Sequence, residues 1–247
     1  MTPDMDPDQT RAWISDLLKG LRDTFLDGRL ILGGSSGLFA FATAAPAFTE
    51  DLDFLVEEEL VVARGSDFIR LFEGLGFLRV PDSPTFLKEG GPGFDLVGYS
   101  RIDFVDHLSP EGDLRVMVFG ELGRILEEPG SVETGLSGIR ALSPAAFCAV
   151  KLLTLRVDKG AKDKLQALLV IAERKEDASF LATLSRMLRA FGSDRVFDVV
   201  GDAQAAFLSL QRDPMFRDHG AEGYAPFIER AAAGQETLVR LLGEPAP

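Results

Sequence analysis

Two short apolar runs, "RLILG" at residues 29–33 and "DLDFLV" at residues 51–56, constrain the fold of this chain most strongly. Each run has the length and composition of a buried strand. Side chains two residues apart in a strand share a face, so Asp51 and Asp53 project together. Two carboxylates this close repel each other and resist desolvation. The pattern therefore predicts a cation or a metal ion beside one face of a sheet.

A glycine-rich turn, Gly33-Gly34-Ser35, closes the first run. Glycine allows the backbone to approach an anion, and the N-terminus of a following helix offers free N–H groups to phosphate. Ser35 or Ser36 is expected to cap such a helix, which would run through about Ala44. A phosphate cradle followed by a carboxylate pair suited to Mg²⁺ provides the two parts that transfer on a nucleoside triphosphate requires. Each motif alone is common by chance, and it is their order and spacing that favour a function.

The remaining pattern changes character near residue 142. Before it, helical periodicity alternates with strand-like runs, and after it the chain is helical almost to its end. We therefore expect an α+β fold, in which a small mixed sheet with flanking helices is followed by a C-terminal helical bundle. The predicted domains are an α/β domain at 1–142 and a helical domain at 143–247. The main predicted elements of the first domain are helices at 8–26 and 66–76 and strands at 77–80, 85–88, 94–107 and 114–119.

Charge and hydropathy narrow the classes of function. The formal net charge is −13, which disfavours non-specific binding to DNA or to an anionic membrane. No apolar run reaches the roughly 18 residues of a membrane span, and the acidic N-terminus does not resemble a signal peptide. We expect a cytoplasmic protein with no membrane partner.

The single cysteine and the two histidines do not point to a metal centre. Cys148 lies in an apolar helical run, which predicts a packed thiol rather than a nucleophile. His107 and His219 are far apart and lack ligand partners at metal-binding spacing, so both are expected at the surface.

The segment "LGGSS…TEDLDFLV" resembles the nucleotidyltransferase signature of the DNA polymerase β superfamily. Within that superfamily it is most similar to the AbiEii-type toxin nucleotidyltransferases, in which a Pro-Arg-x-Thr-x-Asp-x-Asp run is frequent. Pro46, Thr49, Asp51 and Asp53 match that run, and Ala47 stands where the family has arginine. The resemblance implies a nucleotidyltransferase fold over roughly residues 28–172.

The resemblance also implies a third carboxylate on a neighbouring strand. "SRIDFVDHL" supplies Asp103, which we favour, and Asp95 and Asp106 are the alternatives. Asp95 and Asp103 share a face if the strand at 94–107 is unbroken, whereas Asp106 points the other way. An ordinary acid at the end of a strand is the competing interpretation of Asp103.

A second block that resembles the family runs from "ALSPAAFCAVKLL" to "AKDKLQALL", where Lys151, Lys162 and Asp163 match. Gln166 stands where a second acid is frequent. The local excess of basic side chains could bind a triphosphate, and a solvated helix face is the alternative.

The resemblance implies transfer of a nucleotide from an NTP to an acceptor, RNA or protein, possibly by the toxin of a toxin–antitoxin pair with a cognate antitoxin. Asp51, Asp53 and Asp103 would hold Mg²⁺ or Mn²⁺ and catalyse transfer. An antibiotic-modifying enzyme with a small-molecule acceptor is one alternative. A non-catalytic protein that binds nucleotide or a partner is another, supported by Ala47 and Gln166. The implied nucleotide-binding residues are Gly33, Gly34, Ser35, Thr49, Lys151, Lys162 and Asp163.

Overall fold

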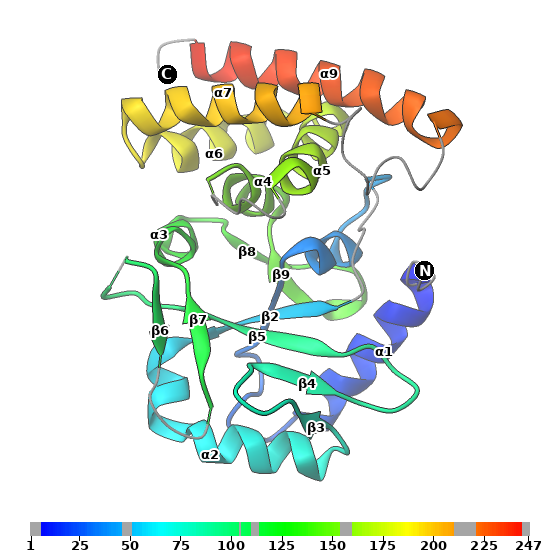
Figure 1. The fold of residues 1–247 in the computed structure, drawn as a ribbon, viewed down its shortest axis with the longest axis vertical. Helices are drawn as coiled ribbons and strands as arrows, with labels where there is room; N and C mark the ends of the chain where they lie inside the picture. The colour runs from blue at the N-terminus through cyan, green and yellow to red at the C-terminus, as the bar shows by residue number, and fades with distance from the viewer. Residues whose placement is uncertain are drawn as a thin grey trace. The chain divides into compact units, whose positions relative to one another are not determined.

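A computed structural model describes residues 6–45, 51–103, 105–109, 114–153, 160–209 and 221–243. The chain forms two compact units. Unit 1 comprises Met1–Ala42 and Ala47–Ser143, and unit 2 comprises Thr43–Pro46 and Pro144–Pro247. The sequence predicted the change of domain between residues 142 and 143. The predicted α+β class is confirmed, with a mixed sheet and flanking helices followed by helices alone (Figure 1).

The sheet of unit 1 has the strand order β3-β4-β5-β2-β1-β9-β8, and β7 joins it by pairing with β5 and with β6. It is mixed, because β2 runs parallel to β5 and β1 parallel to β9, whereas β1 and β2 are antiparallel. The strands are β1 Ile31–Gly33, β2 Leu52–Glu57, β3 Leu78–Arg79, β4 Thr85–Leu87, β5 Phe94–Tyr99, β6 His107–Ser109, β7 Val116–Val118, β8 Val132–Thr134 and β9 Arg140–Leu142.

One face of this sheet forms the core. Alternate residues of the central strands, such as Phe54 and Phe94, are buried and pack with α1 (Pro7–Gly20) and α2 (Glu58–Gly74). The ring of Phe72 from α2 lies 4.9 Å from that of Phe94, and Phe86 stacks on Phe94 at 5.2 Å. Aromatic side chains bury large apolar areas, so this cluster fixes α2 against the strands.

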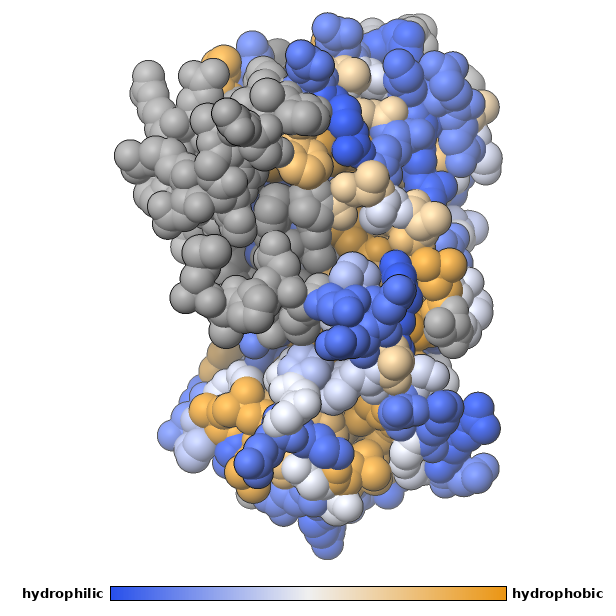
Figure 2. All heavy atoms as spheres, turned by 90° about the vertical axis from the view of Figure 1, so that its right-hand side faces the viewer, coloured by the Kyte–Doolittle hydropathy of each residue, from blue (hydrophilic) through white to orange (hydrophobic). Residues whose placement is uncertain are grey.

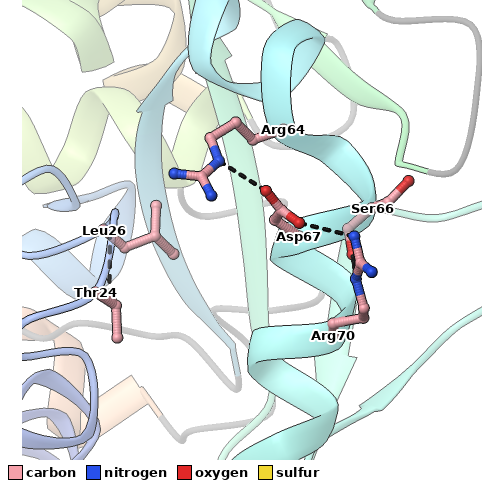
Figure 3. Close-up of polar contacts among 6 residues, drawn as sticks. All are labelled: Thr24, Leu26, Arg64, Ser66, Asp67 and Arg70. Atoms are coloured by element: carbon pink, nitrogen blue, oxygen red, sulfur yellow. Dashed lines mark hydrogen bonds and ion pairs between the residues drawn. The ribbon is translucent and has the colours of Figure 1, made fainter.

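The first helix ends six residues before the predicted position. Asp6 caps its N-terminus by accepting from the Asp8 N–H at 2.9 Å, but α1 stops at Gly20. Asp23 then takes a φ of 60°, which a helix does not allow. The Thr24 hydroxyl accepts from the Leu26 N–H at 3.2 Å and holds the turn that follows (Figure 3).

The second helix begins eight residues earlier than predicted and is kinked. Arg64 has non-helical dihedral angles (φ −140°, ψ 24°), and its guanidinium lies 4.2 Å from the ring centre of Phe25. Arg64 and Arg70 both donate to Asp67, at 2.7 and 2.8 Å (Figure 3). The cation–π contact and the ion pairs stabilise the kinked conformation. Beyond the helix, Gly76 has a φ of 84°, the left-handed conformation that glycine often adopts where a helix ends.

The connections around the sheet are short. The α-helix predicted after Ser35 is a 3₁₀-helix, η1 (Ser35–Ala40), which is short as such helices usually are. The strand predicted at 94–107 is broken, because β5 ends at Tyr99 and β6 begins at His107. The helices between β7 and β9 are α3 (Gly120–Glu127) and η2 (Leu136–Gly138).

Unit 2 is helical, with α4 Pro144–Leu153, α5 Gly160–Glu173, α6 Ala178–Arg189, α7 Ser193–Ser209 and α9 Ala221–Gly243. Cys148 is fully buried in α4, as predicted, and burial raises the pKa of its thiol. Within the described residues, no helix is both long and apolar enough to cross a bilayer.

A short segment before β2 belongs to unit 2. The Thr43 hydroxyl donates to Glu173 Oε2 at 2.6 Å, and the Ala44 N–H donates to Glu173 Oε1 at 3.0 Å. Arg230 of α9 forms an ion pair with the same carboxylate. Glu173 therefore anchors the segment through which the chain approaches the strand with the two aspartates.

Unit 2 contains a close helix crossing that we use for a stability prediction. A Cβ on Gly234 of α9 would lie 2.0 Å from the carbonyl oxygen of Leu168 in α5, whereas nothing lies within 4 Å of a Cβ on Gly201 in α7. Gly234→Ala should lower the free energy of unfolding by about 1–3 kcal/mol, because the helices must separate. Gly201→Ala should raise it by up to about 1 kcal/mol through helix propensity. Urea titration of both variants measures the change in the free energy of unfolding. Equal changes in the two variants would contradict the close approach of α5 and α9.

Candidate functional site

The register of three strands brings the candidate residues of unit 1 together. Gly33 at the end of β1 pairs with Asp53 of β2, and Asp53 pairs with Asp95 of β5. Paired residues on neighbouring strands point to the same face. Because Leu52 and Phe54 are buried on the face that packs with α1 and α2, the two aspartates lie on the opposite face.

Gly34 lies directly against the Asp53 carboxylate. Its φ is 54°, and a Cβ at this position would lie 1.7 Å from Asp53 Oδ2. Both the backbone conformation and the contact therefore require glycine. The predicted turn and the predicted carboxylate are in direct contact, which the sequence indicated only by their order along the chain.

Ser36 holds the glycine turn and the Asp53 backbone together through two hydrogen bonds. Its hydroxyl donates to the Gly33 carbonyl at 2.7 Å and accepts from the Asp53 N–H at 3.0 Å. The side chain is fully buried. The residue at the N-cap position of η1 is Gly34, not Ser35 or Ser36. The predicted capping role is therefore wrong, and Ser36 instead ties the glycine turn to β2.

Asp95 and Asp51 complete the polar end of this face. Thr85 of β4 donates its hydroxyl hydrogen to Asp95 Oδ1 at 2.6 Å, and the Ser83 hydroxyl lies 2.6 Å from that of Thr85. Asp51 is exposed just before β2, and its Oδ1 lies 4.0 Å from the position of a Cβ on Gly93. Asp51, Asp53 and Asp95 thus share one face at the N-terminal ends of β2 and β5.

These carboxylates fit a divalent cation that a ligand helps to coordinate. Among the residues that the structure describes, no three His, Cys, Asp or Glu side chains lie close enough together to hold a metal. Mg²⁺ is commonly bound by one or two carboxylates together with substrate phosphates and water. The oxygen-only donors of Asp51 and Asp53 match that mode of binding.

Asp103 is not brought to this site. It is exposed beyond the C-terminal end of β5, where its N–H donates to Ser100 Oγ at 3.0 Å and its Oδ1 accepts from the Val105 N–H at 3.0 Å. Asp53 and Asp95 lie at the N-terminal ends of their parallel strands. The prediction for Asp103 needed an unbroken strand, and the break after Tyr99 removes that basis. Asp95, the alternative, is instead paired with Asp53.

Asp106 and His107 have structural partners at the same end of β5 as Asp103. Asp106 Oδ1 accepts from the Gly120 N–H at 2.6 Å at the start of α3. His107 is half-buried rather than fully exposed, with Nε2 2.8 Å from Glu58 Oε1 and Nδ1 2.7 Å from the Val105 carbonyl. Two acceptors favour the doubly protonated ring, and the Val105 carbonyl followed by Glu58 raises the pKa of His107.

The basic block of unit 2 is largely buried. The Lys151 ammonium forms an ion pair with Asp163, and both side chains are buried between α4 and α5. Lys164 donates to the carbonyls of Lys151 and Leu152 at 2.8 and 2.6 Å, and burial lowers the pKa of Lys164 to about 8. Lys162 is half-buried. The solvated-face alternative is therefore wrong for Lys151, and the phosphate-binding role of these residues stays a prediction.

The predicted positions that lie outside the described residues are Pro46, Ala47, Thr49 and His219. Two residues that contribute to the observed site, Thr85 and Gly93, were not predicted from the sequence. A threonine in a strand next to a buried phenylalanine gives no sign of its partner, because strand register depends on long-range pairing.

A solved structure matches this chain at low sequence identity. No protein-family profile matches the chain. A crystal structure of a "putative nucleotidyltransferase" from H. pylori matches 96% of this chain and 95% of its own, with a TM-score of 0.46 and 16% sequence identity.

The Gly34 contact predicts a large difference between two glycines of similar backbone conformation. Gly28 has a φ of 65°, and nothing lies within 4 Å of a Cβ there. Gly28→Ala should cost about 1 kcal/mol of backbone strain. Gly34→Ala should cost more, because the methyl group must displace the Asp53 carboxylate. Thermal unfolding compares the two variants, and an equal loss of stability in both would contradict the geometry.

The pair of Glu58 and His107 predicts a pH-dependent contribution to stability. Because the folded-state pKa of His107 is raised, its contribution is complete below the ordinary value of 6.5 and is lost as pH rises through the folded-state pKa. Burial of Glu58 acts to raise its pKa, but hydrogen bonds from Ser109 and His107 lower it below 4.5, so its contribution is lost in acid.

His107→Gln should therefore destabilise the protein more at about pH 5.5 than at about pH 9. Urea titration at both pH values measures the difference in unfolding free energy between wild type and variant. The same difference at both pH values would show that the pKa of His107 is not raised in the folded protein.

Proposed function

We propose that this chain is a metal-dependent nucleotidyltransferase that moves a nucleoside monophosphate from an NTP to a hydroxyl acceptor. The observation that carries the proposal is the contact between the Gly34 turn and Asp53, with Asp51 and Asp95 on the same face. A glycine turn beside paired carboxylates suits a triphosphate whose charge a cation neutralises.

Asp51 and Asp53 would hold Mg²⁺ or Mn²⁺, and Asp95 replaces Asp103 as the proposed third carboxylate. When bound, such an ion stabilises the negative charge that develops on the phosphates. Gly33, Gly34 and Ser35 would receive the β- and γ-phosphates through the backbone N–H groups of the turn.

Asp95 is suited to accept a proton from the attacking hydroxyl. Thr85 donates to its Oδ1, which orients the carboxylate and leaves Oδ2 for the proton. In the proposed reaction the acceptor oxygen forms a bond to the α-phosphorus. The bond from that phosphorus to the bridging oxygen breaks, pyrophosphate leaves, and the proton moves to Asp95. Alignment of the attacking and leaving oxygens supplies much of the rate in such transfers.

RNA or protein is the proposed acceptor, and the resemblance to AbiEii-type proteins makes a toxin with a cognate antitoxin the biological role we propose. A nucleotide-binding role of Thr49, Lys151, Lys162 and Asp163 stays a prediction that follows from the resemblance. The buried pair of Lys151 and Asp163 supports a role in holding α4 and α5 together as well.

Two matched aspartates test the third-carboxylate assignment. Asp95→Asn should reduce transfer at least about a hundredfold, because an amide cannot take the proton or the charge that the carboxylate does. Asp103→Asn should leave transfer unchanged, since its contacts lie at the other end of the strand.

The assay measures incorporation of α-labelled NTPs into total RNA or protein in the presence of Mg²⁺. Asp53→Asn serves as the negative control, because it should also weaken binding of the Mn²⁺–NTP complex in calorimetry. Loss of transfer in Asp103→Asn but not in Asp95→Asn would reverse the assignment. Equal binding of Mn²⁺–NTP by wild type and Asp53→Asn would contradict the proposed function.

A further inference from the structure

A pocket at the start of β1 has a charge unlike that of the chain. It has a volume of about 210 Å³ and is formed by the C-terminal part of α1, the turn that follows α1, and residues at the start of β9. Its charged lining residues are Lys19, Arg22, Arg140 and Asp27. Three cations therefore accompany one carboxylate in a chain whose formal net charge is −13. A local excess of positive charge in an acidic protein favours an anionic ligand.

Arg140 is held in place by the backbone of the same pocket. Its Nη1 donates to the Gly28 carbonyl at 2.6 Å, which ties the start of β9 to the turn before β1. A guanidinium has several N–H donors in a fixed planar arrangement, so one such bond orients the group and leaves other donors for a ligand. The bond therefore prepares Arg140 to bind an anion.

The other charged groups of the lining do not neutralise one another. Lys19 Nζ forms an ion pair with Asp16 at 2.8 Å, and both side chains are exposed, so the pair is weak and the lysine can turn to a ligand. Within the described part of the chain, Arg22 has no ion-pair partner. Asp27 Oδ2 accepts from the Asp23 N–H at 3.2 Å, so a backbone group and not one of the three cations binds this carboxylate.

Two glycines keep space open in the pocket. Gly28 and Gly138 have φ angles of 65° and 74°, and nothing lies within 4 Å of a Cβ at either position. The half-buried Leu18 adds apolar surface from α1. A protein cavity of roughly 150 Å³ holds benzene, so the larger pocket has room for an anionic group together with a small organic group.

The arrangement of the cations favours a phosphate group over a carboxylate. A phosphate monoester carries a charge of about −1.5 to −2 near pH 7 and has three acceptor oxygens, whereas a carboxylate carries one charge on two oxygens. One phosphate group can therefore accept from Lys19, Arg22 and Arg140 together. Hydropathy does not reveal such a site, because hydrophilic and hydrophobic side chains are interspersed over the face of the molecule that Figure 2 presents.

We propose that this pocket binds the phosphate group of a small phosphate monoester, with the organic part of the ligand beside Leu18. The pocket is separate from the glycine turn that precedes η1, because Leu30 in its lining and Gly33 are three residues apart, about 10 Å of extended chain. Phosphate binding here needs neither a divalent cation nor Asp53, so it is independent of the proposed nucleotidyl transfer.

Two arginines of one segment provide a matched test. Arg22 lines the pocket, whereas the exposed Arg29 is not among its lining residues. Arg22→Gln and Arg29→Gln change the net charge equally. Calorimetry with phenyl phosphate, in EDTA and at low salt, measures binding to each variant. Arg22→Gln should weaken binding on the order of tenfold, because a charge-assisted hydrogen bond is lost. Arg29→Gln and Asp53→Asn should bind phenyl phosphate as wild type does.

The same titrations with benzoate, inorganic phosphate and pyrophosphate identify the ligand class. Weaker binding of all three than of phenyl phosphate would support a phosphate monoester. Benzoate bound as tightly as phenyl phosphate would overturn the preference for phosphate, and tighter binding of either inorganic anion would overturn the ester. Equal weakening by Arg22→Gln and Arg29→Gln, or no binding of phenyl phosphate by wild type, would overturn the site itself. None of these results depends on whether Asp53→Asn binds Mn²⁺–NTP, which tests the proposed function separately.

Discussion

Asp53 can occupy its position only because Gly34 has no side chain. The carboxylate occupies the space in which any Cβ at position 34 would lie, so the turn after β1 can close over β2 only with glycine there. Ser36 then ties the two strands through the Gly33 carbonyl and the Asp53 N–H. With β2 fixed in this register, pairing with β5 determines that Asp95 is the next acid along the sheet. Backbone pairing thus positions the acidic cluster.

Local features of the site could be predicted from the sequence, because strand periodicity is a local property. The alternation in "DLDFLV" places Asp51 and Asp53 on one face, and the burial of Leu52 and Phe54 on the other agrees with it. The choice between Asp95 and Asp103 required the end of β5, which periodicity does not reveal. The Ser100 hydroxyl accepts from the N–H groups of Ile102 and Asp103 and stabilises a turn there. A serine after an apolar run is the signal that could have indicated this break.

Tertiary pairing accounts for the other differences. Lys151 and Asp163 are twelve residues apart on consecutive helices, and sequence alone does not show that they face each other. A buried ion pair of this kind contributes little net stability, but removal of one partner leaves a buried charge. The short η1 likewise reflects its surroundings, since its residues are buried throughout and the chain must leave it for unit 2. Helix propensity is easily overridden by such constraints.

The anchoring of Thr43 and Ala44 on Glu173 also limits how this protein can be divided or recombined. Between the glycine turn and β2, residues Thr43–Pro46 belong to unit 2, and the chain then returns to unit 1 and completes the sheet. A fragment that ends at Ser143 keeps every strand that the structure describes but loses Glu173, to which this segment is hydrogen-bonded. A chimera that takes its helices from another protein must therefore supply an equivalent carboxylate. In this respect the two units have to be kept together when the protein is divided or recombined, although each has its own core.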